Sequence, residues 1–300
     1  MKYIGVTPEG EFPLPPPVSA KLVMGEDAPA DGFTGVFPLL ESGRRICAIR
    51  IYGQDGTLRF DGITDEQKES CGAGRTLTLA ARSRAALLLD NEAIPQTYCM
   101  PSLETIFTRH IKPYGFSGFR GERRSFSGEL TVTKGMSEWQ AAESFCTRFL
   151  GRKPRILEGV FDASGEILPG EMVFDNSGGT PYSAAFSEYR YCDRISEILI
   201  KPGKSGAYGT AVKDEEALSL GIRRRRCLAE GNTNADAKIR AARHKSFRAV
   251  VDCPGEIRAR LLQRARVRDP VLGNLDGLYI AEIEYRLDSN GESSRYILRR

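Results

Sequence analysis

Histidine is scarce in this 300-residue chain, which contains only His110 and His244. Each lies among arginines and lysines in a segment that we expect to be helical, and neither has a carboxylate or cysteine partner at helical spacing. Metal binding and acid–base catalysis by histidine usually need such a partner. We therefore expect both histidines to be partly exposed residues on helix surfaces, without a catalytic role.

The cysteines lack the spacing of a metal site or of a disulfide framework. Their number is odd, their separations are wide and irregular, and no C-x-x-C pair occurs. This pattern argues against structural zinc and indicates reduced, mostly buried thiols in a reducing compartment. The seven are Cys47, Cys71, Cys99, Cys146, Cys192, Cys227 and Cys253.

Several catalytic and nucleotide-binding motifs are missing as well. The chain has no G-x-x-x-x-G-K-[ST] loop, no G-x-G-x-x-G between a strand and a helix, and no G-x-S-x-G nucleophile context. Acidic residues are scattered, without a D-x-D or H-x-E cluster for a metal. We expect no enzyme activity, no metal and no cofactor.

Long hydrophobic runs are also absent. No run of 18 apolar residues occurs, and the first twelve residues lack the apolar core of a signal peptide. We therefore expect no membrane span and no secretory leader, and we expect the chain to fold where it is made. The net charge of +4 is too small to indicate nucleic-acid binding by itself.

Short strands separated by turn residues dominate the first part of the chain. Residues 1–17 end in a proline-rich stretch and are expected to form an extended lead-in. Residues 18–96 then contain five strand-like runs, which predict a small antiparallel β-barrel. The runs are 20–24, 33–40, 45–52, 58–63 and 75–81.

The periodicity changes to a helical one in residues 97–180. Ser102 is a plausible N-cap for a helix over 103–110. Ser137 and Gln140 have capping-box spacing before a helix over 138–150 that Gly151 ends. Strands over 126–132, 155–161, 166–168 and 171–174 complete an expected α+β insert.

Residues 181–300 return to strands and predict a second small β-barrel. One helix over 235–245, capped by Thr233 or Asn234, interrupts it, and the sequence from Asp288 to Gly291 predicts a hairpin turn. The fold class expected is thus α+β and β-rich, with two barrels flanking an α+β insert.

Arginine forms the most conspicuous charge patterns. Residues 223–226 are four consecutive arginines, and Arg264, Arg266 and Arg268 alternate with small apolar residues. A row of arginines on one strand face must meet carboxylates or water, in an interface, a channel or a solvated surface. Nucleic-acid binding by these rows is the alternative function. The candidate interface residues are Arg223, Arg224, Arg225, Arg226, Arg264, Arg266 and Arg268, together with Arg82 and Arg84 discussed below.

A series of weak motifs occurs in a characteristic order along residues 16–300. Two places depart from the pattern of the family named in the next paragraph. Ala81 stands where that family has glycine, and residues 200–220 match its second barrel loosely. The motifs are Gln54-Asp55-Gly56, Ala81-Arg82-Ser83, the apolar turn from Leu87 to Asp90, a helix over 103–115, a helix over 135–150, the hairpin from Asp162 to Gly165, the arginine strand over 222–227, a helix over 235–245, and the element from Val250 to Gly255.

In this order the chain resembles the baseplate hub proteins of contractile phage tails. These include the tail hub of phage Mu, the late control protein D family and the N-terminal part of type VI secretion spike proteins. The resemblance implies a homotrimer whose six tube-like barrels form a pseudo-sixfold ring between the tail tube and the central spike. It implies a location in the tail baseplate of a virion or a phage-like particle, with assembly in the bacterial cytoplasm.

The resemblance also implies several partners. These are the central spike protein, the tail tube or tube-initiator protein, LysM-type and wedge baseplate proteins, and the tape measure, with DNA only passing through the lumen. No membrane anchor is implied. Arg82 and Arg84 would anchor the junction between the first barrel and the insert, above a core filled by Leu87, Leu88 and Leu89.

Overall fold

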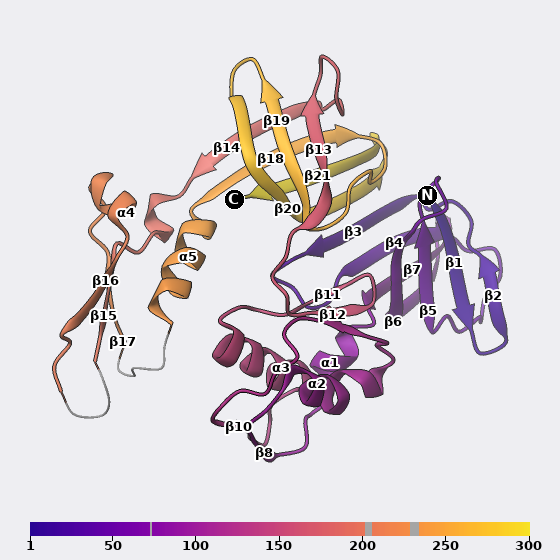
Figure 1. The fold of residues 1–300 in the computed structure, drawn as a ribbon. Helices are drawn as coiled ribbons and strands as arrows, with labels where there is room; N and C mark the ends of the chain where they lie inside the picture. The colour runs from indigo at the N-terminus through magenta and orange to yellow at the C-terminus, as the bar shows by residue number, and fades with distance from the viewer. Residues whose placement is uncertain (73, 202–205, 229–233) are drawn as a thin grey trace.

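The computed structural model describes residues 1–72, 74–201, 206–228 and 234–300 and divides the chain into four regions (Figure 1). Two β units lie side by side, an insert of short helices and strands lies against them, and a slender arm projects from the second unit. Of the helices in the described residues, none is long and apolar enough to cross a membrane.

The first β unit is antiparallel throughout. Residues 1–17, expected as an extended lead-in, instead begin with a hairpin that pairs with β5 at the end of the unit. Strand β6 is more than twice as long as expected, because its polar second half continues to pair with β7 beyond the apolar stretch. In order the strands are β3 (Ser19–Gly25), β4 (Gly32–Pro38), β7 (Arg75–Ser83), β6 (Leu58–Cys71), β5 (Ala48–Tyr52), β1 (Lys2–Thr7) and β2 (Gly10–Pro13).

The second β unit is formed by the C-terminal strands and by one strand from the expected insert. Strand β13 (Leu168–Asp175) was expected in the insert, but it pairs in parallel with β19 (Gln263–Asp269). The hairpin turn at Asp288–Gly291 is confirmed. The remaining strands are β14 (Ala184–Tyr189), β18 (Phe247–Pro254), β21 (Gly291–Arg299) and β20 (Gly273–Asp288).

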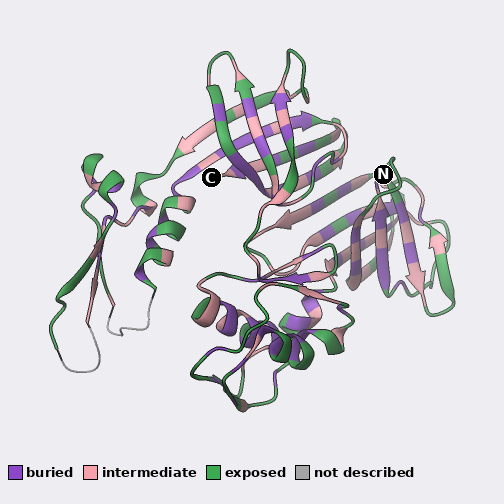
Figure 2. Cartoon of the chain, in the orientation of Figure 1, coloured by how far each residue is buried: buried purple, intermediate pink, exposed green. Residues whose placement is uncertain are grey.

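The two β units form one continuous sheet. Strand β20 is 16 residues long, so its first part pairs with β19 and its later part pairs antiparallel with β3, from Glu282↔Gly25 to Leu287↔Ala20. One apolar core runs through both units, from Tyr3 to Leu298 (Figure 2). The β-rich α+β class is therefore confirmed. Within the described ranges no strand pairing closes either unit into a ring, so barrel closure stays a prediction.

The insert is held together by its own core, which extends from Ala85 to Ala163. Both expected caps are present: Ser102 accepts a hydrogen bond from Thr105 N–H, and Ser137 and Gln140 form a complete capping box. The helices are α1 (Ala86–Asp90), α2 (Leu103–Ile106) continued by a π-helical turn (Phe107–Ile111), and α3 (Glu138–Phe145) continued by another (Cys146–Leu150). The strands are β8 (Gln96–Cys99), β9 (Phe119–Arg120), β10 (Glu129–Val132), β11 (Arg155–Leu157) and β12 (Val160–Asp162).

The arm was expected to be part of the second barrel, but its strands form a separate sheet. This sheet has the order β16-β15-β17 and packs on α5 through Ile198, Ala235 and Ile239. Asn234 caps α5, whereas the alternative cap Thr233 lies outside the described residues. The arm comprises β15 (Glu197–Ile200), β16 (Thr210–Lys213), α4 (Glu215–Ser219), β17 (Arg225–Leu228) and α5 (Ala235–Lys245).

Candidate assembly surfaces

The titratable side chains do not form a recognisable metal centre. In the described part of the chain, no group of three or more His, Cys, Asp or Glu residues is arranged to hold a metal ion. All seven cysteines are free thiols, and five are exposed, with only Cys146 and Cys253 buried. The expectation of mostly buried thiols was therefore wrong, because the polar loops and strand edges that carry the other five lie outside both cores.

His110 is buried, contrary to the expectation of an exposed helix residue. Its Nδ1 lies 2.5 Å from Glu138 Oε2, and its Nε2 lies 2.8 Å from the Tyr98 hydroxyl. Tyr114 donates a further hydrogen bond to Glu138. The partner carboxylate comes from α3 and not from the same helix, so spacing along the sequence could not reveal it. The network lies within the insert core and holds α3 against the helix of His110.

Arg82 links the first β unit to the insert through two carboxylates. Its guanidinium donates to Asp65 on β6 at 2.7 and 2.9 Å and to Asp90 at the end of α1 at 2.7 and 3.1 Å. Arg84 pairs with Asp61 at 2.7 Å. Below them Leu88 is fully buried and Leu87 is half-buried, but Leu89 is exposed, so the predicted core role is wrong for Leu89.

The arginines of β19 alternate with buried residues, as expected. Ala265 and Val267 face the core. Arg264 and Arg268 are exposed, whereas Arg266 pairs with Asp276 at 2.7 Å and with Glu171 at 3.4 Å. The middle arginine of the row is thus neutralised within the chain, which leaves the two outer ones for solvent or a partner.

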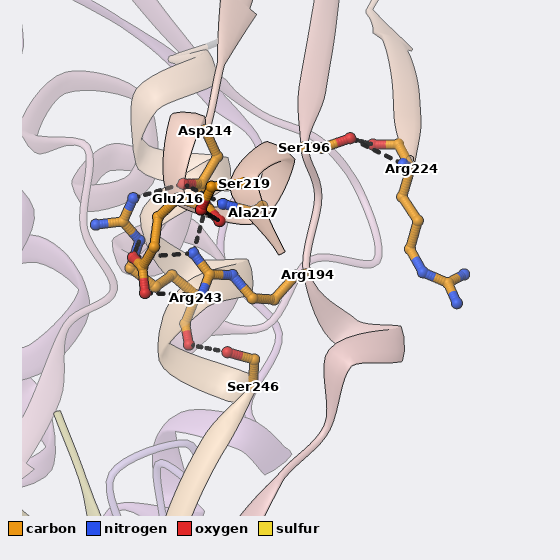
Figure 3. A network of polar contacts seen from close by, with 9 residues as sticks. All are labelled: Arg194, Ser196, Asp214, Glu216, Ala217, Ser219, Arg224, Arg243 and Ser246. Carbon is orange, nitrogen blue, oxygen red and sulfur yellow. Dashed lines mark hydrogen bonds and ion pairs between the residues drawn. The ribbon is translucent and has the colours of Figure 1, made fainter. Parts of the chain in front are cut away.

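The base of the arm is fixed by a buried ionic network that the sequence did not predict (Figure 3). Asp214 accepts hydrogen bonds from Arg194 at 2.8 Å, from Arg243 of α5 at 2.7 Å and from the backbone N–H of Ala217. Burial opposes ionisation of Asp214, but the hydrogen bonds from Arg194 and Arg243 outweigh it and lower its pKa. The one local signal was the N-cap position of Asp214 before Glu215 and Glu216.

The four consecutive arginines lie at the end of the arm sheet. Arg223 donates to the Leu218 carbonyl, and Arg225 pairs with Glu197 at 2.5 Å. All four side chains are exposed, and β17 is the last strand in the order β16-β15-β17. Arg225 and Arg226 thus lie on an edge strand of the arm sheet.

Positive charge is concentrated in the arm. Residues 190–245 contain thirteen lysines and arginines against seven aspartates and glutamates, a net charge of +6, whereas the whole chain carries +4. The remainder of the chain is therefore slightly acidic. Such an asymmetry favours contact between the arm and an anionic surface.

A second polar junction joins the arm to both β units. Tyr279 of β20 donates a hydrogen bond to the Glu26 carboxylate at 3.0 Å and contacts His244 of α5. Arg299 of β21 donates to Glu26 at 3.1 Å and to Asp27 at 2.8 Å. His244 is half-buried in this cluster, and burial together with the nearby Arg299 lowers its pKa.

The main path of the continuous sheet ends at β2 on one side and at β14 on the other, and β13 ends a branch that joins β20 through β19. Strand β14 carries two exposed aromatic residues, Phe186 at 46% and Tyr189 at 50% exposure. Tyr189 stacks on Tyr191 with ring centroids 6.2 Å apart. Large apolar side chains beside an unpaired strand are typical of a protein contact.

Structural comparison finds the same fold in phage tail proteins. A tail protein from Neisseria meningitidis MC58 matches with a TM-score of 0.76 and 17% identity over 100% of this chain and 96% of its own. The 43 kDa tail protein of prophage MuSo2 from Shewanella oneidensis matches with a TM-score of 0.76 and 17% identity over 100% and 98%.

A more distant match is the E. coli c3393 protein, a component of the type VI secretion system. It has a TM-score of 0.57 and 6% identity over 94% of this chain and 73% of its own. No family profile and no curated protein sequence matches the chain. The resemblance to phage tail and type VI secretion proteins is therefore confirmed at the level of the β-rich fold, whereas closed barrels stay a prediction.

Proposed function

We propose that this chain is a structural baseplate hub of a contractile phage tail or a related injection particle. The observation that carries the proposal is the whole-chain match, since two phage tail proteins match 100% of this chain over 96% and 98% of their own lengths. Folds alone do not determine function. The absence of a metal cluster within the described ranges and the abundance of sheet edges and exposed arginines are consistent with a protein that works by assembly.

Three copies would supply six β units for a ring between the sixfold tail tube and the threefold spike. Within one chain, β20 and β3 already join two units edge to edge. A similar edge contact between subunits would continue the sheet around the ring, and it would cover edges that otherwise favour aggregation. We assign this contact to β14, because it ends the sheet and exposes Phe186 and Tyr189.

The arm is our candidate for contacts with other baseplate components. It projects from the second unit (Figure 1). Residues 190–245, which include the arm, carry a net charge of +6, whereas the rest of the chain is slightly acidic. Wedge proteins, LysM-type proteins, the tube initiator, the tape measure and the spike are the proposed partners. Arg264 and Arg268 offer a second basic surface on β19.

The hub proposal is tested by measuring mass in solution. Multi-angle light scattering at about 100 µM should report a species of three times 33.1 kDa, or an equilibrium that approaches it with concentration. The double variant Phe186→Glu, Tyr189→Glu should remain monomeric. Its control is Val271→Glu, at a 91% exposed position between β19 and β20, which should assemble normally. A wild-type monomer at this concentration with spike protein present would contradict the proposal.

The charge of the arm favours a second candidate, a nucleic-acid-binding protein. In that case a 20-base-pair duplex should bind at physiological salt, and the affinity should fall steeply as salt is raised. Replacing Arg223 to Arg226 with serine should abolish the binding, while the pair Arg264→Ser, Arg268→Ser serves as a control for loss of charge elsewhere. Binding that is confined to low salt would indicate only non-specific attraction.

A further inference from the structure

A cleft of about 510 Å³ lies where the first β unit, the insert and the second β unit meet. Asp31 and Ser83 line it from the first unit, Phe116 and Ile156 from the insert, and Ile257 and Leu261 from the second unit. The rest of the lining mixes apolar residues, such as Leu58 and Leu168, with polar and charged ones. A cleft of this volume accommodates a ligand larger than a single side chain.

Nearly every charged group of the cleft is neutralised by a neighbour. Arg84 pairs with Asp61 at 2.7 Å, and Arg260 pairs with Glu158 at 3.4 Å. Arg59 pairs with Asp55 at 2.9 Å. Asp31 differs, because none of the described lysines and arginines lies within ion-pair distance of its carboxylate.

The position of Asp31 is fixed by its backbone and not by an ionic partner. Its N–H donates to Ser83 Oγ at 3.0 Å, and Ser83 N–H donates to the Asp31 carbonyl at 2.8 Å. Burial raises the pKa of the carboxylate to about 7 and outweighs the opposing effect of the nearby Gly25 backbone. At neutral pH this group is thus partly ionised beside apolar surface. A cation bound there would be stabilised more strongly by the carboxylate than it would be by a fully solvated one.

We infer that this cleft is a docking site for a lysine on an extended segment of a partner protein. The ammonium group would pair with Asp31, and the four-carbon stem would lie along the apolar lining near Phe116 and Ile257. The volume leaves room for residues on either side of the lysine. Because the cleft is lined by three regions, a bound segment would also fix these regions relative to one another. The inference does not depend on ring formation.

The probe is the labelled pentapeptide acetyl-Val-Ala-Lys-Ala-Val amide, compared with the same peptide containing norleucine in place of lysine. Isothermal titration at pH 8 should show at least tenfold tighter binding of the lysine peptide. The preference should fall at least tenfold at pH 5.5, because Asp31 is then protonated. n-Butylammonium chloride distinguishes a protein segment from a free amine, and it should bind at least tenfold more weakly than the lysine peptide.

Two variants and one control assign the binding to the cleft. Asp31→Asn should abolish the preference for lysine, and Ser117→Trp should block the mouth of the cleft and abolish binding of both peptides. Asp236→Asn, an exposed aspartate of α5, should leave binding unchanged. Circular dichroism verifies that each variant is folded.

Three results would overturn the inference. Equal affinity of the lysine and norleucine peptides would show that Asp31 does not select for lysine. Equal affinity for n-butylammonium and the lysine peptide would assign the site to a free amine. Failure of the wild-type protein to bind the lysine peptide would show that the cleft is not a lysine-docking site.

Discussion

The hydroxyl of Tyr98 lies 2.8 Å from Nε2 of His110, inside the core of the insert. Since Nδ1 faces Glu138, both contacts are satisfied by a neutral imidazole that donates from Nδ1 and accepts at Nε2. Tyr114 supplies another donor to the same carboxylate at 3.1 Å. The insert thus buries the Glu138 carboxylate between two donors, His110 and Tyr114, which come from adjacent helical turns, and this makes the packing of α3 specific.

Removing His110 should therefore destabilise the insert strongly. In His110→Ala the buried Glu138 loses one of its donors, and we expect a loss of about 2–4 kcal/mol in the free energy of unfolding. Urea denaturation followed by tryptophan fluorescence measures this through Trp139, the neighbour of Glu138. The exposed neighbour Arg109→Ala is the control and should change stability by less than about 0.5 kcal/mol. Equal effects of the two variants would contradict a structural role for the network.

The short helix α1 provides a matched pair for testing the junction below Arg82. Leu88 is fully buried, whereas its neighbour Leu89 is 36% exposed. Leu88→Asp places a charge in the insert core, so we expect a loss of more than about 4 kcal/mol, enough to prevent folding or assembly. Leu89→Asp should fold and assemble normally. Normal assembly of the Leu88 variant would refute the proposed role of the junction.

Local features of this fold were predictable because they depend on neighbouring residues. The capping box of Ser137 and Gln140, the stop at Gly151 and the hairpin at Asp288 each involve a few consecutive residues. The buried face of β19 likewise follows from simple alternation. The order of such local motifs was sufficient to indicate the fold.

Features that depend on distant contacts could not be predicted. The hairpin of β1 and β2 exists because β5 provides a partner, and β13 leaves the insert because it pairs with β19, almost a hundred residues later. Likewise, Glu138 reaches His110 only after α3 has packed. Three-dimensional pairing also explains why the arm became separate from the second β unit, since its strands satisfy one another.

The unpaired Asp31 should make stability depend on pH. Burial raises its folded-state pKa to about 7, whereas an unfolded aspartate titrates near 4. Between these values the folded chain binds more protons than the unfolded chain, so this group lowers stability as pH rises from about 4 to 7. Asp31→Asn should remove the dependence and be about 4 kcal/mol more stable than wild type at pH 8, with little difference at pH 4. Guanidinium titrations at both pH values measure it, with Asp236→Asn as the control. If wild type and Asp31→Asn differed in stability by the same amount at pH 4 and at pH 8, Asp31 would not be desolvated in the folded chain.

Asp214 should have the opposite influence on stability. Its folded-state pKa lies below the usual range, so its contribution is present above about pH 4 and is lost as the pH falls through the lowered value. In Asp214→Asn the hydrogen-bond acceptor remains, but Arg194, which is buried, loses its closest counter-charge.

We expect the Asp214 variant to loosen the arm without unfolding the β units, because the shared core of the units does not include this network. Amide hydrogen exchange should therefore accelerate at least tenfold in α4 and α5 and remain unchanged in β20 and β21. The control is Glu215→Gln, an exposed residue of α4, which should exchange like wild type. If exchange increased equally in the arm and in β20, the arm would be part of the main cooperative unit, and its role as an independently anchored contact element would have to be abandoned.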